Sequence, residues 1–133
     1  MVKMSKEVMD MVNDPNAPSI LATVSIEGIP DVVPMGTFSA VDEETLAFAD
    51  VFLLKTKKNL ETTKKTAVTA FKKTDGYQIK GTFKEFQTSG PIFEKKKKMV
   101  KDKLDLDIRS VGIIKVEEVY VVSIGPEAGK QIA

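Results

Sequence analysis

The segment Lys55-Thr56-Lys57-Lys58-Asn59-Leu60, which brings together ammonium, hydroxyl and amide groups, is the most informative part of the chain for function. It is expected to follow a strand and a loop and to open a helix, where free N–H groups and the helix dipole favour an anion. Lys55 adds a full charge, the Thr56 hydroxyl can cap the helix or contact a ligand, and Asn59 adds an amide one turn later. Phosphate is bound by this mixture of donors. A solvated, lysine-rich helix start capped by Thr56 explains the same residues, and the segment alone does not decide between the two.

A second segment, Val33-Pro34-Met35-Gly36-Thr37, lies where a strand is expected to lose regular pairing. Pro34 lacks an N–H donor, and Gly36 permits close approach by another group. A flat ring could therefore form hydrogen bonds with the backbone at this point. A β-bulge at a barrel corner is an equally good interpretation.

Four consecutive lysines, Lys95 to Lys98, suggest a patch for nucleic acid or a membrane surface. Their apolar neighbours Ile92, Met99 and Val100 instead predict an amphipathic helix with a core face. We interpret the lysines as one solvated face of that helix.

Composition excludes several classes of active site. The 133-residue chain has no Cys and no His, so it cannot form a thiol nucleophile, an imidazole base or a metal site with Cys or His ligands, and we expect no metal. Lys and Arg number 20 against 19 Asp and Glu, a balance that argues against a protein built mainly to bind nucleic acid. Arg109 is the only arginine, so bidentate recognition of an anion can occur at one place at most. Any catalysis must therefore use the remaining side chains or a cofactor.

Strands are the main elements that must position these groups. Turn residues and apolar alternation predict six strands and three short helices without a repeat or linker, and we expect one domain over residues 1–133. The strands are predicted at 19–25, 30–38, 45–49, 66–71, 77–86 and 112–124, and the helices at 5–12, 57–63 and 91–104. This pattern indicates a mainly β protein, an antiparallel β-barrel with short helices, rather than βαβ units.

Taken in order, five segments resemble the pyridoxamine 5'-phosphate oxidase-like family of FMN-binding split barrels. The resemblance covers roughly residues 20–90 and rests on the order and spacing of the segments, because none of them is specific by itself. They are L-A-T-V-S-I-E-G-I-P-D-V-V-P-M, L-A-F-A-D, K-T-K-K-N-L, A-V-T-A-F and G-Y-Q-I-K-G-T-F.

The resemblance implies a six-stranded split barrel that forms a homodimer, with two FMN sites at the subunit interface. By position, the phosphate would be held at the start of the second helix, by Lys55, Thr56 and Asn59. The end of the second strand would approach the isoalloxazine edge, and the end of the third strand would line the same pocket. These two groups are Pro34, Met35, Gly36 and Thr37, and Ala49, Asp50 and Val51.

The chain departs from the true oxidase at its C-terminal end. The oxidase holds its vitamin substrate with Arg and His there, whereas this sequence has no His and its segment V-S-I-G-P-E-A-G-K-Q lacks that pattern. Oxidation of pyridoxine phosphate is therefore not expected, and no catalytic residue is assigned. The chain is more similar to short members that bind FMN without an assigned substrate.

We therefore expect a flavoprotein that uses FMN for electron transfer or as an oxidoreductase on an unidentified substrate, with a small-molecule redox partner. One alternative is a deazaflavin in the same fold. Another is a non-catalytic barrel that binds single-stranded nucleic acid or an anionic metabolite, which the balanced charge disfavours. The sequence has no apolar run near the roughly 18 residues of a membrane span and no signal-peptide core. A cytoplasmic protein without a membrane or nucleic-acid partner is expected.

Overall fold

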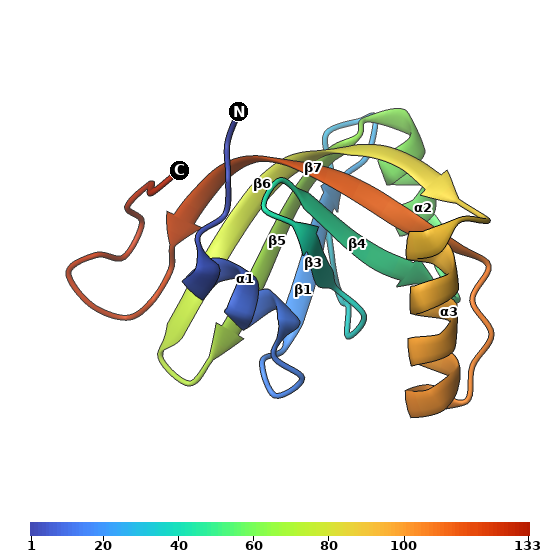
Figure 1. Ribbon diagram of the computed structural model, residues 1–133. Coiled ribbons are helices and arrows are strands. Elements are labelled where there is room, and N and C mark those ends of the chain that lie inside the picture. Colours follow the sequence, from blue (N-terminus) through green and yellow to red (C-terminus); the bar gives the residue numbers. More distant parts are fainter.

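A computed structural model describes residues 1–133 as one seven-stranded antiparallel sheet with three helices around it (Figure 1). The helices are α1 (Lys6–Asn13), α2 (Lys55–Thr62) and α3 (Pro91–Leu104). The strands are β1 (Ser19–Val24), β2 (Pro30–Pro34), β3 (Ser39–Asp42), β4 (Thr45–Asp50), β5 (Lys65–Lys72), β6 (Asp75–Gln87) and β7 (Ser110–Val121). The predicted mainly β, antiparallel class is confirmed, but the strands number seven and not six.

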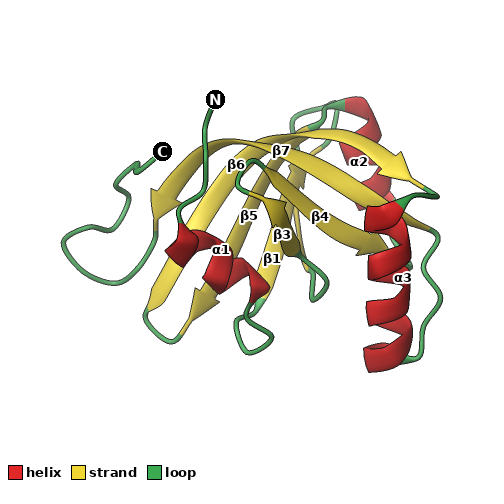
Figure 2. Cartoon of the chain, viewed as in Figure 1, coloured by secondary structure: helices red, strands yellow, loops and turns green.

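The sheet curves strongly, and its strands follow the order β2-β1-β5-β6-β7-β4-β3 (Figure 2). Every neighbouring pair is antiparallel. β2 and β3 are the two edge strands and do not pair with each other, so the barrel is split between them.

The additional strand comes from the chain after Pro34. The sequence predicts one strand over residues 30–38, whereas β2 ends at Pro34 and β3 begins at Ser39. Between them, the Thr37 hydroxyl accepts a hydrogen bond from the Ala49 N–H of β4 (2.9 Å). The chain therefore passes from one edge of the sheet to the other at this turn, and apolar alternation does not reveal such a crossing.

The main core contains side chains from most strands and two helices. Leu21 of β1, Phe48 of β4 and Ile114 of β7 are completely buried, and Val8 of α1 and Leu60 of α2 pack into the same cluster. A fully buried side chain of this size contributes about 1.5–3 kcal/mol. Leu60 thus holds α2 firmly against the sheet.

One glycine lets β7 pass close to this core. A Cβ added at Gly112 would overlap the ring of Phe48. That ring also packs against Phe38, with ring centroids 5.2 Å apart, and against Phe86, at 6.3 Å. Only glycine therefore fits at position 112 without moving an aromatic cluster.

The starts of α1 and α3 agree with the predicted helices at 5–12 and 91–104. Ser5 accepts a hydrogen bond from the Val8 N–H (3.4 Å) at the start of α1, and Pro91 occupies the first turn of α3. α3 packs against β4 and β7, where Phe93 joins a second small apolar cluster. None of the three helices has the length and apolar character needed to cross a lipid bilayer.

Candidate functional site

The first turn of α2 offers unpaired donors. The N-cap residue is Leu54, whose side chain forms no cap, and the N–H groups of Lys55, Thr56 and Lys57 have no acceptor in the chain. The prediction that Thr56 is the N-cap is therefore wrong: it lies inside the helix, and its side chain is buried. Three N–H groups and the positive end of the helix dipole remain available to an anion.

Lys55 and Thr56 converge on one carboxylate. The Thr56 hydroxyl donates to Oδ2 of Asp31 on β2 (2.8 Å), and the Lys55 ammonium lies 3.1 Å from Oδ1. The Asp31 side chain is 12% exposed, and the Lys55 side chain is 79% exposed. Burial alone would raise the pKa of Asp31, but the Thr56 and Lys55 contacts hold it below its ordinary value of 3.8. Asp31 is therefore ionised at neutral pH.

Asn59 faces the same hairpin from the next turn of the helix. Its amide nitrogen donates to the Thr23 hydroxyl of β1 (3.1 Å), and both residues are buried. This bond joins α2 to β1. The structure thus gives Asn59 a framework contact beside Lys55 and Thr56.

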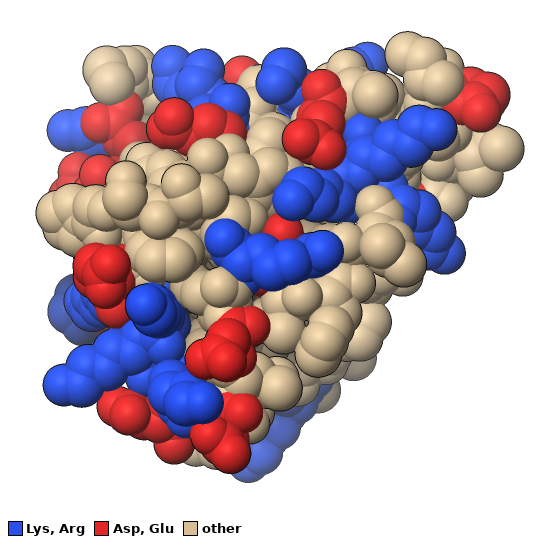
Figure 3. Space-filling view, turned by 90° about the vertical axis from the view of Figure 1, so that its right-hand side faces the viewer, with Lys and Arg blue, Asp and Glu red and all other residues tan.

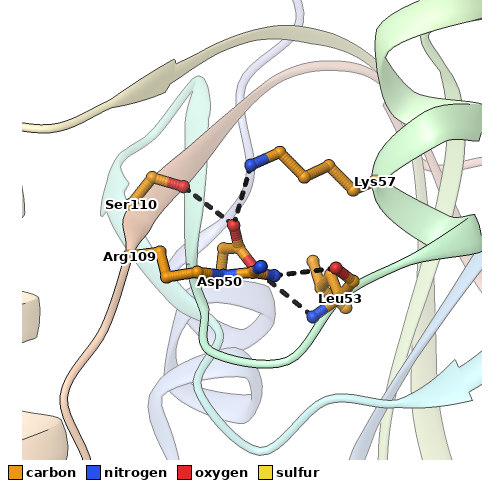
Figure 4. Close-up of polar contacts among 5 residues, drawn as sticks. All are labelled: Asp50, Leu53, Lys57, Arg109 and Ser110. Atoms are coloured by element: carbon orange, nitrogen blue, oxygen red, sulfur yellow. Dashed lines mark hydrogen bonds and ion pairs between the residues drawn. The ribbon is translucent and has the colours of Figure 1, made fainter.

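Asp50 forms a second polar cluster at the end of β4 (Figure 4). Its completely buried carboxylate accepts hydrogen bonds from Arg109 (2.7 Å), the Ser110 hydroxyl (3.1 Å) and the Lys57 ammonium (3.2 Å). Burial would raise the pKa of Asp50, but these three donors hold it below its ordinary value. The result is a fixed anion that ties β4, α2 and β7 together.

Arg109 also fixes the loop before α2. Its guanidinium donates to the Leu53 carbonyl (2.7 Å), while the Leu53 N–H donates to Asp50 (3.3 Å). The only arginine of the chain therefore binds one of the chain's own carboxylates, that of Asp50. It sets the path of the loop that leads to the free end of α2.

Comparison with known proteins identifies the family. The sequence model of pyridoxamine 5'-phosphate oxidase matches residues 4–123. The chain belongs to the pyridoxamine 5'-phosphate oxidase family. The predicted resemblance is thus confirmed and extends well beyond residues 20–90.

Individual members of this fold cover almost the whole chain. Protein MJ0282 of Methanocaldococcus jannaschii, which bears no functional name, is 35% identical over 136 residues, 99% of this chain and 89% of that protein. HupZ of Group A Streptococcus is 28% identical with a TM-score of 0.80, over 95% of this chain and 99% of that chain. An FMN-binding protein from Syntrophomonas wolfei has a TM-score of 0.83 at 16% identity, over 90% of this chain and 86% of that chain, and shows the shared fold.

The site residues inferred from the oxidase family fall into two groups. Lys55, Thr56 and Asn59 lie together where α2 meets β1 and β2, and Asp50 is linked to them through Lys57. Val51 lies in the loop between Asp50 and α2 and is partly exposed.

The second group surrounds the turn after β2. Met35, Gly36 and Thr37 line a cavity of about 270 Å³ with residues of α1 and α3, and no residue of α2 lines it. Pro34 is exposed at the end of β2, and Ala49 is buried beside Thr37. No hydrogen bond or ion pair joins this turn to Lys55 or Thr56.

The loop before α2 exposes apolar surface next to Lys55. Phe52 and Leu54 are 77% and 80% exposed. Large apolar side chains this accessible, within a loop that Arg109 and Asp50 hold in place, favour contact with a ligand ring or a second chain.

Sequence reasoning missed Asp31 and misplaced Lys96. Lys96 is 4% exposed and its ammonium donates to the Ser39 hydroxyl (2.6 Å), so it does not belong to the solvated face of α3. Its spacing from Phe93 and Val100 was the available signal, because those positions share one helical stripe. Asp31 offered no such signal.

The rest of the predicted lysine face is solvated. Lys95, Lys97 and Lys98 are exposed, and Lys101 pairs with Asp105 at 3.2 Å. The side of the molecule that carries α3 shows both signs of charge interspersed (Figure 3). This face therefore lacks the continuous basic stripe typical of nucleic-acid binding.

Proposed function

We propose that the chain binds FMN, with the phosphate at the start of α2, and serves as a flavoprotein in redox chemistry or electron transfer. The observation that carries the proposal is the convergence of Lys55 and Thr56 on the two oxygens of one carboxylate, at 3.1 and 2.8 Å. Donors that meet on a carboxylate are also placed for two oxygens of a phosphate. The three free N–H groups of the first turn add to them.

We call this site, formed by Lys55, Thr56 and the free N–H groups of the first turn of α2, the phosphate clamp. Its residues and their neighbours have separate roles. Lys55 supplies the charge, and its exposed side chain is free to follow a ligand; Thr56 supplies a neutral donor. Asp31 competes for both, since a phosphate must take over donors that the carboxylate now holds. The Asp50 cluster keeps the loop and the helix start in position before the ligand arrives.

Flavin carries its own redox chemistry at the N5 atom, so the chain needs to supply binding and electrostatics only. Exposed Phe52 and Leu54 provide apolar surface beside the clamp for the ring or the ribityl chain. A deazaflavin that carries a phosphate would use the same surface and the same donors.

The same exposed surface supports a homodimer in which a second copy completes the flavin site. A lasting interface needs roughly 1,000 Å² of buried area. Light scattering at micromolar concentration with FMN present is expected to give twice the chain mass of 14.6 kDa. A mass of one chain would contradict the shared site.

Titrations with FMN and riboflavin test the clamp. Hydrogen bonds to charged groups contribute about 1.5–3 kcal/mol, so Lys55→Ala is expected to weaken the binding of FMN roughly tenfold to hundredfold. Thr56→Val should cost somewhat less, because the N–H donors remain. Riboflavin lacks the phosphate, and its weaker binding should barely change.

Lys58→Ala is the matched control, since Lys58 is exposed on the same helix and forms no ion pair. Its FMN affinity should stay near that of the wild type. Equal losses for FMN and riboflavin would show that the clamp is assigned wrongly. Protein that leaves FMN fluorescence unchanged and stays colourless after soaking would refute FMN binding itself.

A further inference from the structure

Lys96 is a buried ammonium group that the proposed flavin site does not use. No carboxylate lies within ion-pair distance of it, and its one hydrogen-bond partner is the Ser39 hydroxyl of β3 at 2.6 Å. An ammonium group has three donors, so two of them have no acceptor in the chain. Burying an unpaired charge is costly, which makes a purely structural role a poor explanation.

A cavity of about 280 Å³ lies beside Lys96, between α3, β3 and the end of α1. Its apolar walls are Val41 of β3 and Ile92 and Met99 of α3, and Lys95 adds a second cation. No acidic residue lines it. The cavity therefore joins an electropositive end to an apolar wall.

Burial and the neighbouring charges disfavour the charged form of Lys96. Burial, and then the positive charges of Lys95 and Lys103 on the same helix, lower the pKa of Lys96 from 10.5 to about 8. The residues that face it from β3 and α1, such as Ser39 and Asn13, do not titrate. An anion in the cavity would supply the missing counter-charge.

The acidic residue of the adjoining cavity does not supply it. Asp14 lines that cavity and pairs instead with Lys72 at 3.2 Å. Lys96 thus stays without a counter-ion from α1.

We propose that this cavity binds the carboxylate of a small organic acid with a short apolar chain, with Lys96 as its cationic contact. The Ser39 hydroxyl, which accepts from Lys96, keeps its own proton to donate to the second carboxylate oxygen. One ammonium matches the single charge of a carboxylate, whereas a phosphate dianion needs more donors. The site shares no residue with the clamp on α2, and through Met99 it adjoins the cavity lined by Met35, Gly36 and Thr37.

Butyrate and uncharged butyramide, followed by NMR of protein labelled at methionine methyl groups, test this proposal. The Met99 methyl lines the cavity and should shift with butyrate far more than with butyramide. Lys96→Met, which removes the charge and keeps an apolar chain, is expected to weaken the binding of butyrate roughly tenfold to hundredfold. Lys95→Met is the matched control, with a change of about threefold or less because that lysine is exposed.

Two further readouts use the unaltered chain. Butyrate affinity of the wild type should fall as the pH rises through about 8, because Lys96 loses its proton there. The preference of the wild type for butyrate over butyramide is the second readout, and it stands even if Lys96→Met does not fold. Any of three results would overturn the proposal. They are a Met99 methyl signal that does not shift with butyrate, an equal loss of butyrate affinity in Lys96→Met and Lys95→Met, or a wild type that binds butyramide as tightly as butyrate.

Discussion

Replacing Asp31 by asparagine is expected to strengthen FMN binding. In the wild type the Asp31 carboxylate holds the Thr56 hydroxyl and the Lys55 ammonium at 2.8 and 3.1 Å. The Asp31 carboxylate repels a phosphate bound here, and the phosphate must replace it as the acceptor for both donors. Asparagine keeps the size of the side chain and an acceptor for Thr56, but removes the charge.

The size of the gain in FMN affinity follows from how exposed the Asp31–Lys55 pair is. Two unit charges 4 Å apart interact by about 1 kcal/mol in water and about 4 kcal/mol at an effective dielectric constant of 20. The Asp31 side chain is 12% exposed, but the phosphate would lie beside Lys55, which is 79% exposed, so a value between these limits and nearer to that of water applies. Because a phosphate monoester carries roughly 1.5 to 2 charges, Asp31 should cost FMN about 1–3 kcal/mol. Asp31→Asn should therefore lower the Kd for FMN by a factor between about 5 and about 140.

The assay is quenching of FMN fluorescence at fixed salt, with riboflavin titrated in parallel. Glu27→Gln is the matched control, since Glu27 lies exposed in the same hairpin and forms no ion pair. Both substitutions remove one negative charge. Riboflavin binding should be the same in all three proteins. The reasoning is refuted if Asp31→Asn binds FMN no more tightly than the wild type, or if Glu27→Gln gains as much.

Three further predictions concern the framework. Asp50→Asn should lower the free energy of unfolding, measured with urea, by about 2–3 kcal/mol. The loss should be smaller than the roughly 3–5 kcal/mol for a fully buried pair, because Arg109 and Lys57 reach solvent. The control Asp75→Asn, at an exposed position, should change the free energy of unfolding little. Since the pKa of Asp50 is lowered on folding, its contribution is complete above the ordinary value of 3.8 and is lost as the pH falls through its folded pKa. The stability gap between wild type and Asp50→Asn should therefore narrow below about pH 4, and a constant gap would contradict the assigned ionisation. Gly112→Ala should lower the free energy of unfolding by about 1–3 kcal/mol, because its Cβ would overlap the Phe48 ring, and the Tm should fall accordingly. The control is Gly36→Ala, whose Cβ would meet no neighbour, so its Tm should stay near that of the wild type.

Local patterns in the sequence predicted most of the framework. The boundaries of α3 follow from Pro91 and a helical stripe, and most strands follow from turns and apolar alternation, because these signals depend on neighbours a few positions apart. The missing His and Cys exclude whole classes of chemistry in any fold. The placement of Lys55 and Thr56 at a helix start was also predictable, since a loop and a lysine-rich helix follow a strand there.

The tertiary structure decided which groups meet. Thr56 and Asp31 lie 25 positions apart, Lys96 and Ser39 lie 57 apart, and Arg109 and Asp50 lie 59 apart. Such contacts depend on sheet order and register, and no local propensity encodes them. For this reason Asp31 changes from an ordinary strand residue into a competitor for the proposed phosphate clamp, and one of four similar lysines becomes a buried cation.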